Sequence, residues 1–233
     1  MLKKLLLLGL VTLLPSLQSN AQTIKFEGKD FETANVKASV IDFEGEKVLK
    51  LERDLTRLPF DADRLESTVD EPTFVKLKDF NMEDGSIEVK VFSQIQDPSP
   101  FKFAQGFIGL AFRVTDDNAA FESIYLRPKV GRSDNQEHRN KAVQYYSYPD
   151  YKFERLRKEH PNRYETSAQV ALKEWIMMRI EFEGEKAALY INGAKYSTMV
   201  VSKLLGSSKS GSVGLWVDIG TTGYFKDLKI TKL

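Results

Sequence analysis

The chain has 233 residues, with 34 lysines and arginines against 33 aspartates and glutamates, and it contains no cysteine. The near-neutral charge argues against a nucleic-acid partner, because such proteins carry a broad basic field. The absence of cysteine excludes disulfides, thiolate metal sites and a cysteine nucleophile. A chain of this length can bury one sizeable hydrophobic core without such cross-links.

The first residues have the layout of a secretory signal peptide. Lys3 and Lys4 precede an apolar run, and Ser19-Asn20-Ala21 places small residues before a cleavage site at Ala21-Gln22. The apolar run is about ten residues long, whereas a transmembrane helix needs about twenty, so a membrane anchor is the less favoured alternative. We therefore expect an exported protein, periplasmic or extracellular, in which residues 1–21 are removed and the mature chain has no membrane span. Removing two of the 34 basic residues and no acid leaves 32 against 33, a net charge of −1.

The remaining chain, residues 22–233, is a series of short strand-like segments separated by turns. Apolar and polar residues alternate with a period of two, and Gly, Asp and Asn punctuate the segments. Helix is expected only at residues 152–158, with 201–205 as a second candidate. This pattern predicts one all-β domain, a two-sheet antiparallel jelly-roll sandwich. The predicted strands are 38–43, 47–51, 73–77, 86–92, 106–114, 120–126, 142–148, 175–182, 187–191, 212–217 and 224–230.

Several motifs follow one another in a familiar order. The chain contains Gly106–Arg113 (GFIGLAFR), Tyr125–Pro128 (YLRP), Glu174-Trp175 opening a strand, Ala188–Gly193 (ALYING), Gly211–Trp216 (GSVGLW) and Tyr224–Leu228 (YFKDL). This succession resembles the concanavalin A-like lectin/glucanase superfamily, particularly its laminin G-like members. It is also similar to the 3-keto-disaccharide hydrolase domains that bacteria secrete. The resemblance covers residues 24 to 233 and implies a jelly roll whose concave face often meets glycans.

The chain departs from the catalytic pattern of the laminarinase-type glucanases. Those enzymes need carboxylates two and four or five residues apart on one strand, so that both point into one cleft. The nearest candidate here is Glu83-Asp84 with Glu88, and its first two acids lie in a turn. A glycosidase built on that motif is therefore disfavoured, and no catalytic residue is assigned.

Strand alternation sorts the side chains of four segments by face, because residues two apart share a side. The apolar set of each segment is expected in the core. The opposite set combines aromatic rings, which stack on sugars, with guanidinium and amide groups, which bind hydroxyls or carboxylates. These residues predict a glycan-binding groove on the concave face, although an ordinary solvated sheet face is the alternative. The predicted ligand-binding residues are Arg113, Tyr125, Arg127, Gln144, Tyr146, Trp216 and Asp218.

Two charged loops, residues 129–141 and 150–163, are expected at the rim of this groove. Each holds one of the two histidines, His138 and His160, but the spacing matches no metal-ligand motif. Acid-rich turns at 61–63 and 116–118 have the composition of calcium ligands, yet as turn formers they need no ion. No metal or other cofactor is therefore expected.

Three functions remain open. The favoured one is an exported carbohydrate-binding domain, because no paired carboxylates are visible. The second is a secreted sugar hydrolase or lyase of the 3-keto-disaccharide hydrolase type, with Asp218, Glu122 or a loop histidine as base and Arg113 or Arg127 holding the substrate. The third is a laminin G-like domain that binds another protein.

Overall fold

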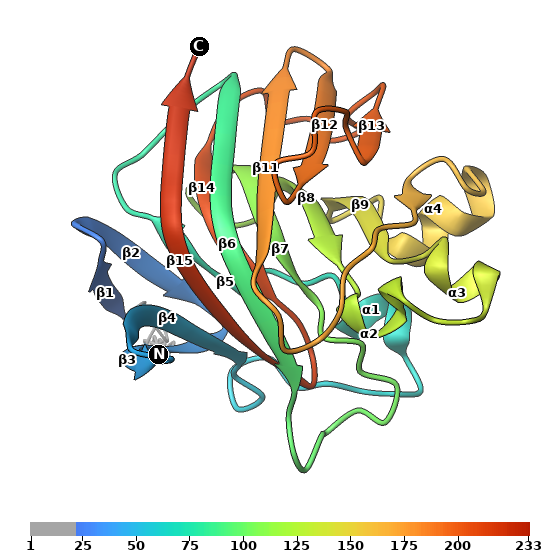
Figure 1. The fold of residues 1–233 in the computed structure, drawn as a ribbon. Coiled ribbons are helices and arrows are strands. Elements are labelled where there is room, and N and C mark those ends of the chain that lie inside the picture. The colour runs from blue at the N-terminus through green and yellow to red at the C-terminus, as the bar shows by residue number, and fades with distance from the viewer. Residues whose placement is uncertain (1–21) are drawn as a thin grey trace, which may run out of the picture.

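The computed structural model describes residues 22–233, and their strands form two antiparallel sheets packed face to face (Figure 1). The predicted signal peptide lies outside the described residues. In spatial order, the eight-stranded sheet contains β1 (Thr23–Phe26), β2 (Lys29–Ala34), β5 (Phe74–Leu77), β14 (Ser212–Val217), β7 (Ile108–Val114), β8 (Phe121–Leu126), β9 (Val143–Tyr148) and β10 (Glu165–Thr166). The seven-stranded sheet contains β13 (Met199–Val201), β12 (Lys186–Ile191), β11 (Ile176–Glu183), β6 (Gly85–Ile95), β15 (Thr221–Lys232), β4 (Glu46–Arg53) and β3 (Val36–Phe43). The predicted all-β jelly-roll sandwich is confirmed.

The core lies between the two sheets and follows the alternation of the strands. Leu110 and Phe112 of β7 are fully buried, as are Ile180 and Phe182 of β11. The rings of Phe112 and Phe182 meet across the sandwich with their centroids 4.6 Å apart. Burial of each such side chain contributes about 1.5–3 kcal/mol, so the core stabilises the fold without disulfides.

All eleven predicted strands are confirmed to within three residues at either end. The helix predicted at residues 152–158 is α4 (Phe153–Glu159). The second helix candidate, 201–205, is wrong, because Val201 ends β13 and the residues after it are irregular. The strands that the alternation missed are β1, β2, β10 and β13, and all of these except β2 have four residues or fewer.

Helices gather at one end of the eight-stranded sheet. Besides α4 they are α1 (Leu65–Thr68), α2 (Pro128–Gly131) and α3 (Gln136–Arg139), and Figure 1 shows α2, α3 and α4 close to β8 and β9. Together with residues 101–107, these helices and the loops around them cover the outer face of β14, β7, β8 and β9. We call residues 65–71, 101–107, 128–141 and 151–164 the covering segments. Every residue of β7, β8 and β14 is buried, so the face that the sequence predicts as an open groove is largely covered.

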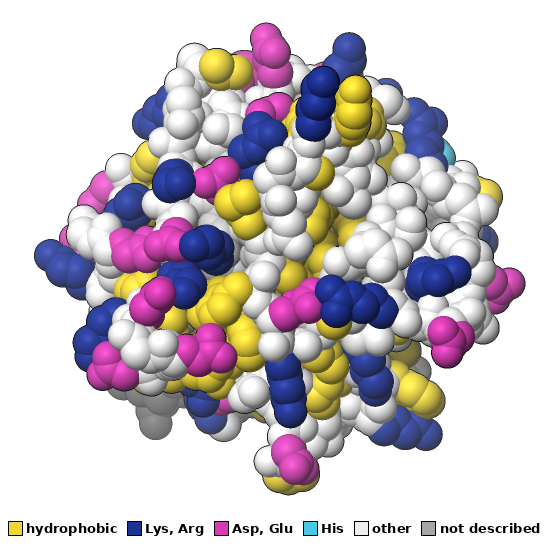
Figure 2. Space-filling view, in the orientation of Figure 1, with side chains coloured by type: hydrophobic (Ala, Val, Ile, Leu, Met, Phe, Trp, Pro, Cys, Tyr) yellow, Lys and Arg dark blue, Asp and Glu magenta, His cyan; other side chains and the backbone are white. Residues whose placement is uncertain are grey.

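Charged side chains of both signs are interspersed over the face of the molecule shown in Figure 2. This matches the balance of 34 basic and 33 acidic residues, and no single-sign field forms on that face. Among the residues that the structure describes, no helix has the length and apolar character needed to cross a bilayer.

Arg53, the last residue of β4, ties the chain that follows it to the sandwich. Its guanidinium donates hydrogen bonds to the backbone carbonyls of Leu58, Pro59 and Thr68. Its Nη1 also forms a buried ion pair with Asp218, 2.8 Å from Oδ1. One side chain of the seven-stranded sheet thus fixes both the 54–68 segment and the end of β14.

We predict that Arg53→Met lowers the free energy of unfolding by about 3–5 kcal/mol, because it leaves the Asp218 carboxylate buried without its cation. Urea unfolding followed by tryptophan fluorescence measures this change. Arg155→Met is the matched control, since Arg155 forms an exposed pair with Glu159 on α4 and its loss leaves stability nearly unchanged. Equal effects of the two substitutions would contradict the assigned role of Arg53.

Candidate functional site

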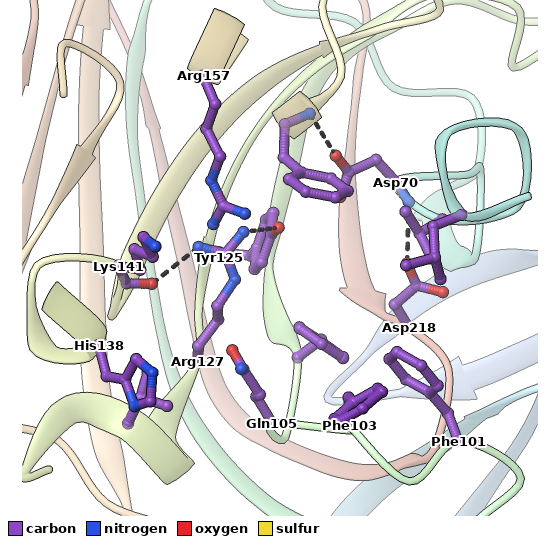
Figure 3. Close-up of a pocket in the computed structure, with 15 residues that line it drawn as sticks. Asp70, Phe101, Phe103, Gln105, Tyr125, Arg127, His138, Lys141, Arg157 and Asp218 are labelled. Atoms are coloured by element: carbon purple, nitrogen blue, oxygen red, sulfur yellow. Dashed lines mark hydrogen bonds between the residues drawn. The ribbon is translucent and has the colours of Figure 1, made fainter. Parts of the chain in front are cut away.

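A cavity of about 340 Å³ lies between the outer face of the eight-stranded sheet and the covering segments (Figure 3). Its floor is formed by Tyr125 of β8 and by Arg127, which follows that strand. Asp218 follows β14 on one side, and α4 contributes Phe153 and Arg157 from above. The other lining residues are Leu65, Val69, Asp70, Phe101, Phe103, Gln105, Phe107, Val130, His138 and Lys141.

Two linked carboxylates form one side of the cavity. The backbone N–H of Asp70 donates to Asp218 Oδ2 over 2.9 Å, while Asp218 Oδ1 accepts from Arg53 and from the backbone N–H of Ile219. Asp70 Oδ2 accepts the backbone N–H of Phe153 at 2.8 Å. No described residue donates a hydrogen bond to Asp70 Oδ1. That oxygen retains its capacity to accept a hydrogen bond.

Burial raises the pKa of Asp70 to about 6. The nearby carboxylate of Asp218 also raises this pKa, whereas the hydrogen bond from Phe153 and the charge of Arg127 lower it. The carboxyl therefore exchanges its proton in the pH range where a general acid or base is effective.

Arg127 is fixed on the other side of the cavity by four acceptors. Nη1 donates to the backbone carbonyl of Lys141 and to Glu165 Oε1, and Nη2 donates to Gln144 Oε1 and to the Tyr125 hydroxyl oxygen, 2.7 Å away. Since both Nη groups are fully engaged, the role of Arg127 is to orient Tyr125 and to supply charge.

The Tyr125 hydroxyl is a hydrogen-bond donor held ready in this cavity. Its oxygen accepts from Arg127, and no described residue accepts its proton. Burial raises the pKa of Tyr125 well above its ordinary value, so the hydroxyl stays protonated at neutral pH. The hydroxyl proton is therefore available to an oxygen atom of a ligand.

Phenylalanine rings form the apolar part of the site. Phe101 and Phe103 meet edge to face with centroids 5.8 Å apart. The ring of Phe107 packs edge to face against Tyr125 at 6.2 Å. Phe103 is 60% exposed, so it offers an open ring surface beside the cavity.

Six of the seven predicted ligand-binding residues cluster at this site. Tyr125, Arg127 and Asp218 line the cavity itself, whereas Gln144, Tyr146 and Trp216 are fully buried beside it. The Trp216 ring lies 4.9 Å from that of Tyr125 and 5.7 Å from that of Tyr146. The rings of Trp216 and Tyr146 therefore hold Tyr125 in place and are themselves not exposed to a ligand.

Arg113 lies apart from the other six, and the face predicted for it is wrong. A β-bulge opens opposite β14, where Ala111 pairs with Gly214 but Val114 pairs with Ser212, and Arg113 takes a left-handed φ of 52°. The bulge turns the side chain toward the seven-stranded sheet. There Arg113 donates to the Gly184 carbonyl and forms an ion pair with Asp84.

The two rim loops predicted from the sequence do contribute to the site. His138 and Lys141 come from the first loop and Arg157 from the second. His160 instead packs edge to face against Tyr164. Glu122, a base candidate, accepts hydrogen bonds from Tyr145 and from the Gly206 backbone and does not line the cavity.

Asp70 and the phenylalanine loop around residues 101–107 were not predicted as site residues. They lie in irregular segments, where no alternation assigns a face. The only sequence signal for the loop is the pair of aromatic residues in its proline-containing stretch, Asp97–Phe103.

In the described part of the chain, no group of three His, Cys, Asp or Glu side chains is placed to hold a metal ion. The acid-rich turns are closed by their own carboxylates: Asp61 accepts from the Asp63 backbone, and Asp117 accepts from the Ala119 backbone.

We predict that the stability of the Asp70→Asn variant, measured relative to the wild type, increases as the pH rises. The folded carboxyl binds its proton more tightly than the unfolded one, with pKa values of about 6 and 3.8. Its contribution to stability is therefore fully present below about pH 4 and is lost as the pH rises through 6. Asparagine cannot ionise, so the free energy of unfolding of the variant relative to the wild type rises by about 2–2.5 kcal/mol between pH 4 and pH 7.

Urea unfolding of both proteins at several pH values measures this difference. Asp117→Asn is the control, because hydrogen bonds lower the pKa of this exposed turn carboxyl and the difference then changes in the opposite direction. A pH-independent difference for Asp70→Asn would contradict the assigned protonation of this carboxyl.

No protein-family model and no curated protein matches the chain. Among solved structures, it is similar to the carbohydrate-binding module CBM66 from Bacillus subtilis, with a TM-score of 0.52 and 13% identity over 85% of this chain and 96% of that one. A putative glycosyl hydrolase from Parabacteroides distasonis matches with a TM-score of 0.47 and 15% identity, covering 85% of this chain and 94% of that one. A Bacillus subtilis protein of unknown function with a galectin-like fold matches with a TM-score of 0.48 and 10% identity over 85% and 87% of the two chains. At these identities, the likeness to the CBM66 module establishes a shared β-sandwich fold.

Proposed function

We propose that this protein is an exported carbohydrate-binding domain that holds a sugar residue in the cavity above Tyr125. The observation that carries the proposal is the pairing of unused hydrogen-bonding groups with aromatic rings in one cavity. Tyr125 offers a donor and Asp70 Oδ1 an acceptor, while Phe101 and Phe107 form an apolar wall. A sugar ring matches both surfaces, because it has an apolar C–H face and hydroxyl groups that donate and accept.

The size of the cavity favours a small ligand unit. At about 340 Å³ it lies at the lower end of the range for small-molecule sites, about 300–1,000 Å³. This volume suits one or two sugar residues rather than a long stretch of polysaccharide. The similarity in fold to a carbohydrate-binding module supports the proposal as an analogy of architecture only.

We predict that Tyr125→Phe weakens sugar binding by about 2–10-fold, because it removes one uncharged hydrogen bond. A glycan array on the purified protein identifies ligands, and isothermal titration calorimetry measures the affinity. Tyr224→Phe is the matched control: it removes a buried hydroxyl that bonds Gln94 on the seven-stranded sheet. Equal affinities of the Tyr125→Phe variant and the wild type would rule out this cavity as the site. If no glycan binds, the laminin G-like reading, in which the domain binds a protein, takes its place.

Phe103 lines the cavity, but its ring is 60% exposed, so we expect it to contact a second sugar residue that extends from the cavity toward solvent. Phe103→Ala is expected to lower the affinity for a disaccharide by about 3–10-fold, since stacking on an aromatic face is lost, and to leave the affinity for the monosaccharide unchanged. Calorimetry with both ligands separates the two effects. Equal losses for both would place Phe103 in the first binding position instead.

A sugar hydrolase or lyase is the second candidate, and Asp70 favours it. This carboxyl lies in the cavity with a pKa of about 6, which suits a general acid or base. If the protein is an enzyme, Asp70→Asn abolishes turnover of the sugar found on the array while retaining its binding. A wild-type protein that binds this sugar without converting it settles the choice for the binding domain.

A further inference from the structure

Two guanidinium groups share a single carboxylate at one wall of the cavity. Glu165 Oε1 lies 2.9 Å from Arg127 Nη1 and 2.6 Å from Arg157 Nη2. Burial opposes ionisation of Glu165, but its hydrogen bonds and charge contacts with both arginines lower its pKa. Among the described residues, no other carboxylate forms an ion pair with either arginine. Arg127, Arg157 and Glu165 together therefore carry a net charge of +1.

Arg157 presents the free edge of its guanidinium at this wall. Nε and Nη2 bind Glu165 side-on, which leaves the Nη1–Nη2 edge open, and Nη1 forms no hydrogen bond with a described residue. The group lies over the Phe153 ring at 4.7 Å, so its orientation is fixed from two sides. In Figure 3 the side chain points toward Tyr125 and Arg127. Such an edge binds a planar two-oxygen group in a bidentate manner.

Lys141 adds a second available cation to the same wall. Its backbone carbonyl accepts from Arg127, but none of the residues described binds its ammonium group through a hydrogen bond or ion pair. Lys141 and Arg157 both line the cavity, and Figure 3 shows them on the side opposite Asp70 and Asp218. Across the cavity, Asp218 is neutralised by Arg53.

The cavity is thus divided by charge. One wall offers a cationic edge suited to a carboxylate, and the other offers Asp70 Oδ1, an acceptor suited to a hydroxyl. A ligand with a carboxylate and several hydroxyls on one ring satisfies both walls at once, whereas a neutral sugar leaves the Arg157 edge unpaired.

We propose that the sugar bound in this cavity is a uronic-acid residue, whose carboxylate is held by Arg157 and Lys141 and whose hydroxyls reach Tyr125 and Asp70. This inference rests on the proposed carbohydrate-binding function and names its ligand class. Arg127 is a positioning residue in this arrangement, because its Nη groups are fully engaged by protein acceptors.

Matched ligands test the proposal directly. Short oligosaccharides of galacturonate, glucuronate and mannuronate are compared by calorimetry at low salt with their carboxyl-reduced counterparts, which keep the same linkages and lose the charge. We expect at least one acidic series to bind tenfold or more tightly than its reduced form. Added salt is expected to reduce this difference in affinity, because it screens the charge of the partly exposed Arg157.

Arg157→Gln is expected to reduce the preference for acidic over carboxyl-reduced ligands to about twofold or less. Lys141→Gln is expected to reduce the same preference in part. The second variant keeps the backbone carbonyl that fixes Arg127 and so preserves the fold if the first does not. Arg155→Gln is the matched control. Arg155 lies two residues earlier on α4, and its exposed guanidinium is paired with Glu159. The Arg155→Gln variant is expected to keep the wild-type preference for acidic ligands.

The outcomes separate this inference from the function on which it rests. If acidic and reduced ligands bind equally and Tyr125→Phe weakens both, the cavity holds a neutral sugar and the uronate assignment is overturned while the proposed function stands. A stronger response to sulfated neutral oligosaccharides than to uronates also overturns it. If no glycan of any kind binds, the proposed function itself fails.

Discussion

The structure around the cavity depends on a chain of three linked groups: Arg53, Asp218 and Asp70. Arg53 ends a strand of the seven-stranded sheet, and Asp218 follows a strand of the eight-stranded sheet, so their ion pair connects the two layers. Asp218 also accepts the backbone N–H of Asp70, and Asp70 accepts that of Phe153 on α4. A buried carboxylate is costly unless its oxygens are satisfied. Because these partners come from four distant segments, satisfying them fixes the position of each segment relative to the sheets.

The sequence predicts the sandwich well because successive side chains of a strand point to opposite faces of the sheet, so that apolar–polar alternation shows which face is buried. Segments such as 86–91 and 176–182 alternate cleanly, and their core residues are buried as expected. The same rule fails at Arg113, where one extra residue in β7 reverses the direction of the side chain. A bulge leaves little trace in a single sequence, because the residues of β7 keep their apolar–polar alternation through it.

The sequence predicts only part of the site, because alternation assigns a face only to residues on strands. Tyr125, Arg127 and Asp218 were found because they lie on or directly after alternating strands. Asp70 and Phe103 were not, because they lie in irregular segments whose positions depend on long-range contacts such as the hydrogen bond from Asp70 to Asp218. Alternation also cannot tell that a polar face is covered by loops, and so a partly covered cavity replaces the expected open groove. In that cavity, the charges of Arg157 and Lys141 are screened less by water than they would be on an open sheet.

The walls of the cavity come from parts of the chain that are far apart in sequence, from Leu65 to Asp218. No single one of these segments provides the whole lining of the cavity, and opening any one of them removes a wall. If the cavity binds a sugar as proposed, ligand affinity and folding are thermodynamically linked. The bound sugar would then stabilise the assembled domain as a whole, by an amount that grows with the logarithm of the sugar concentration.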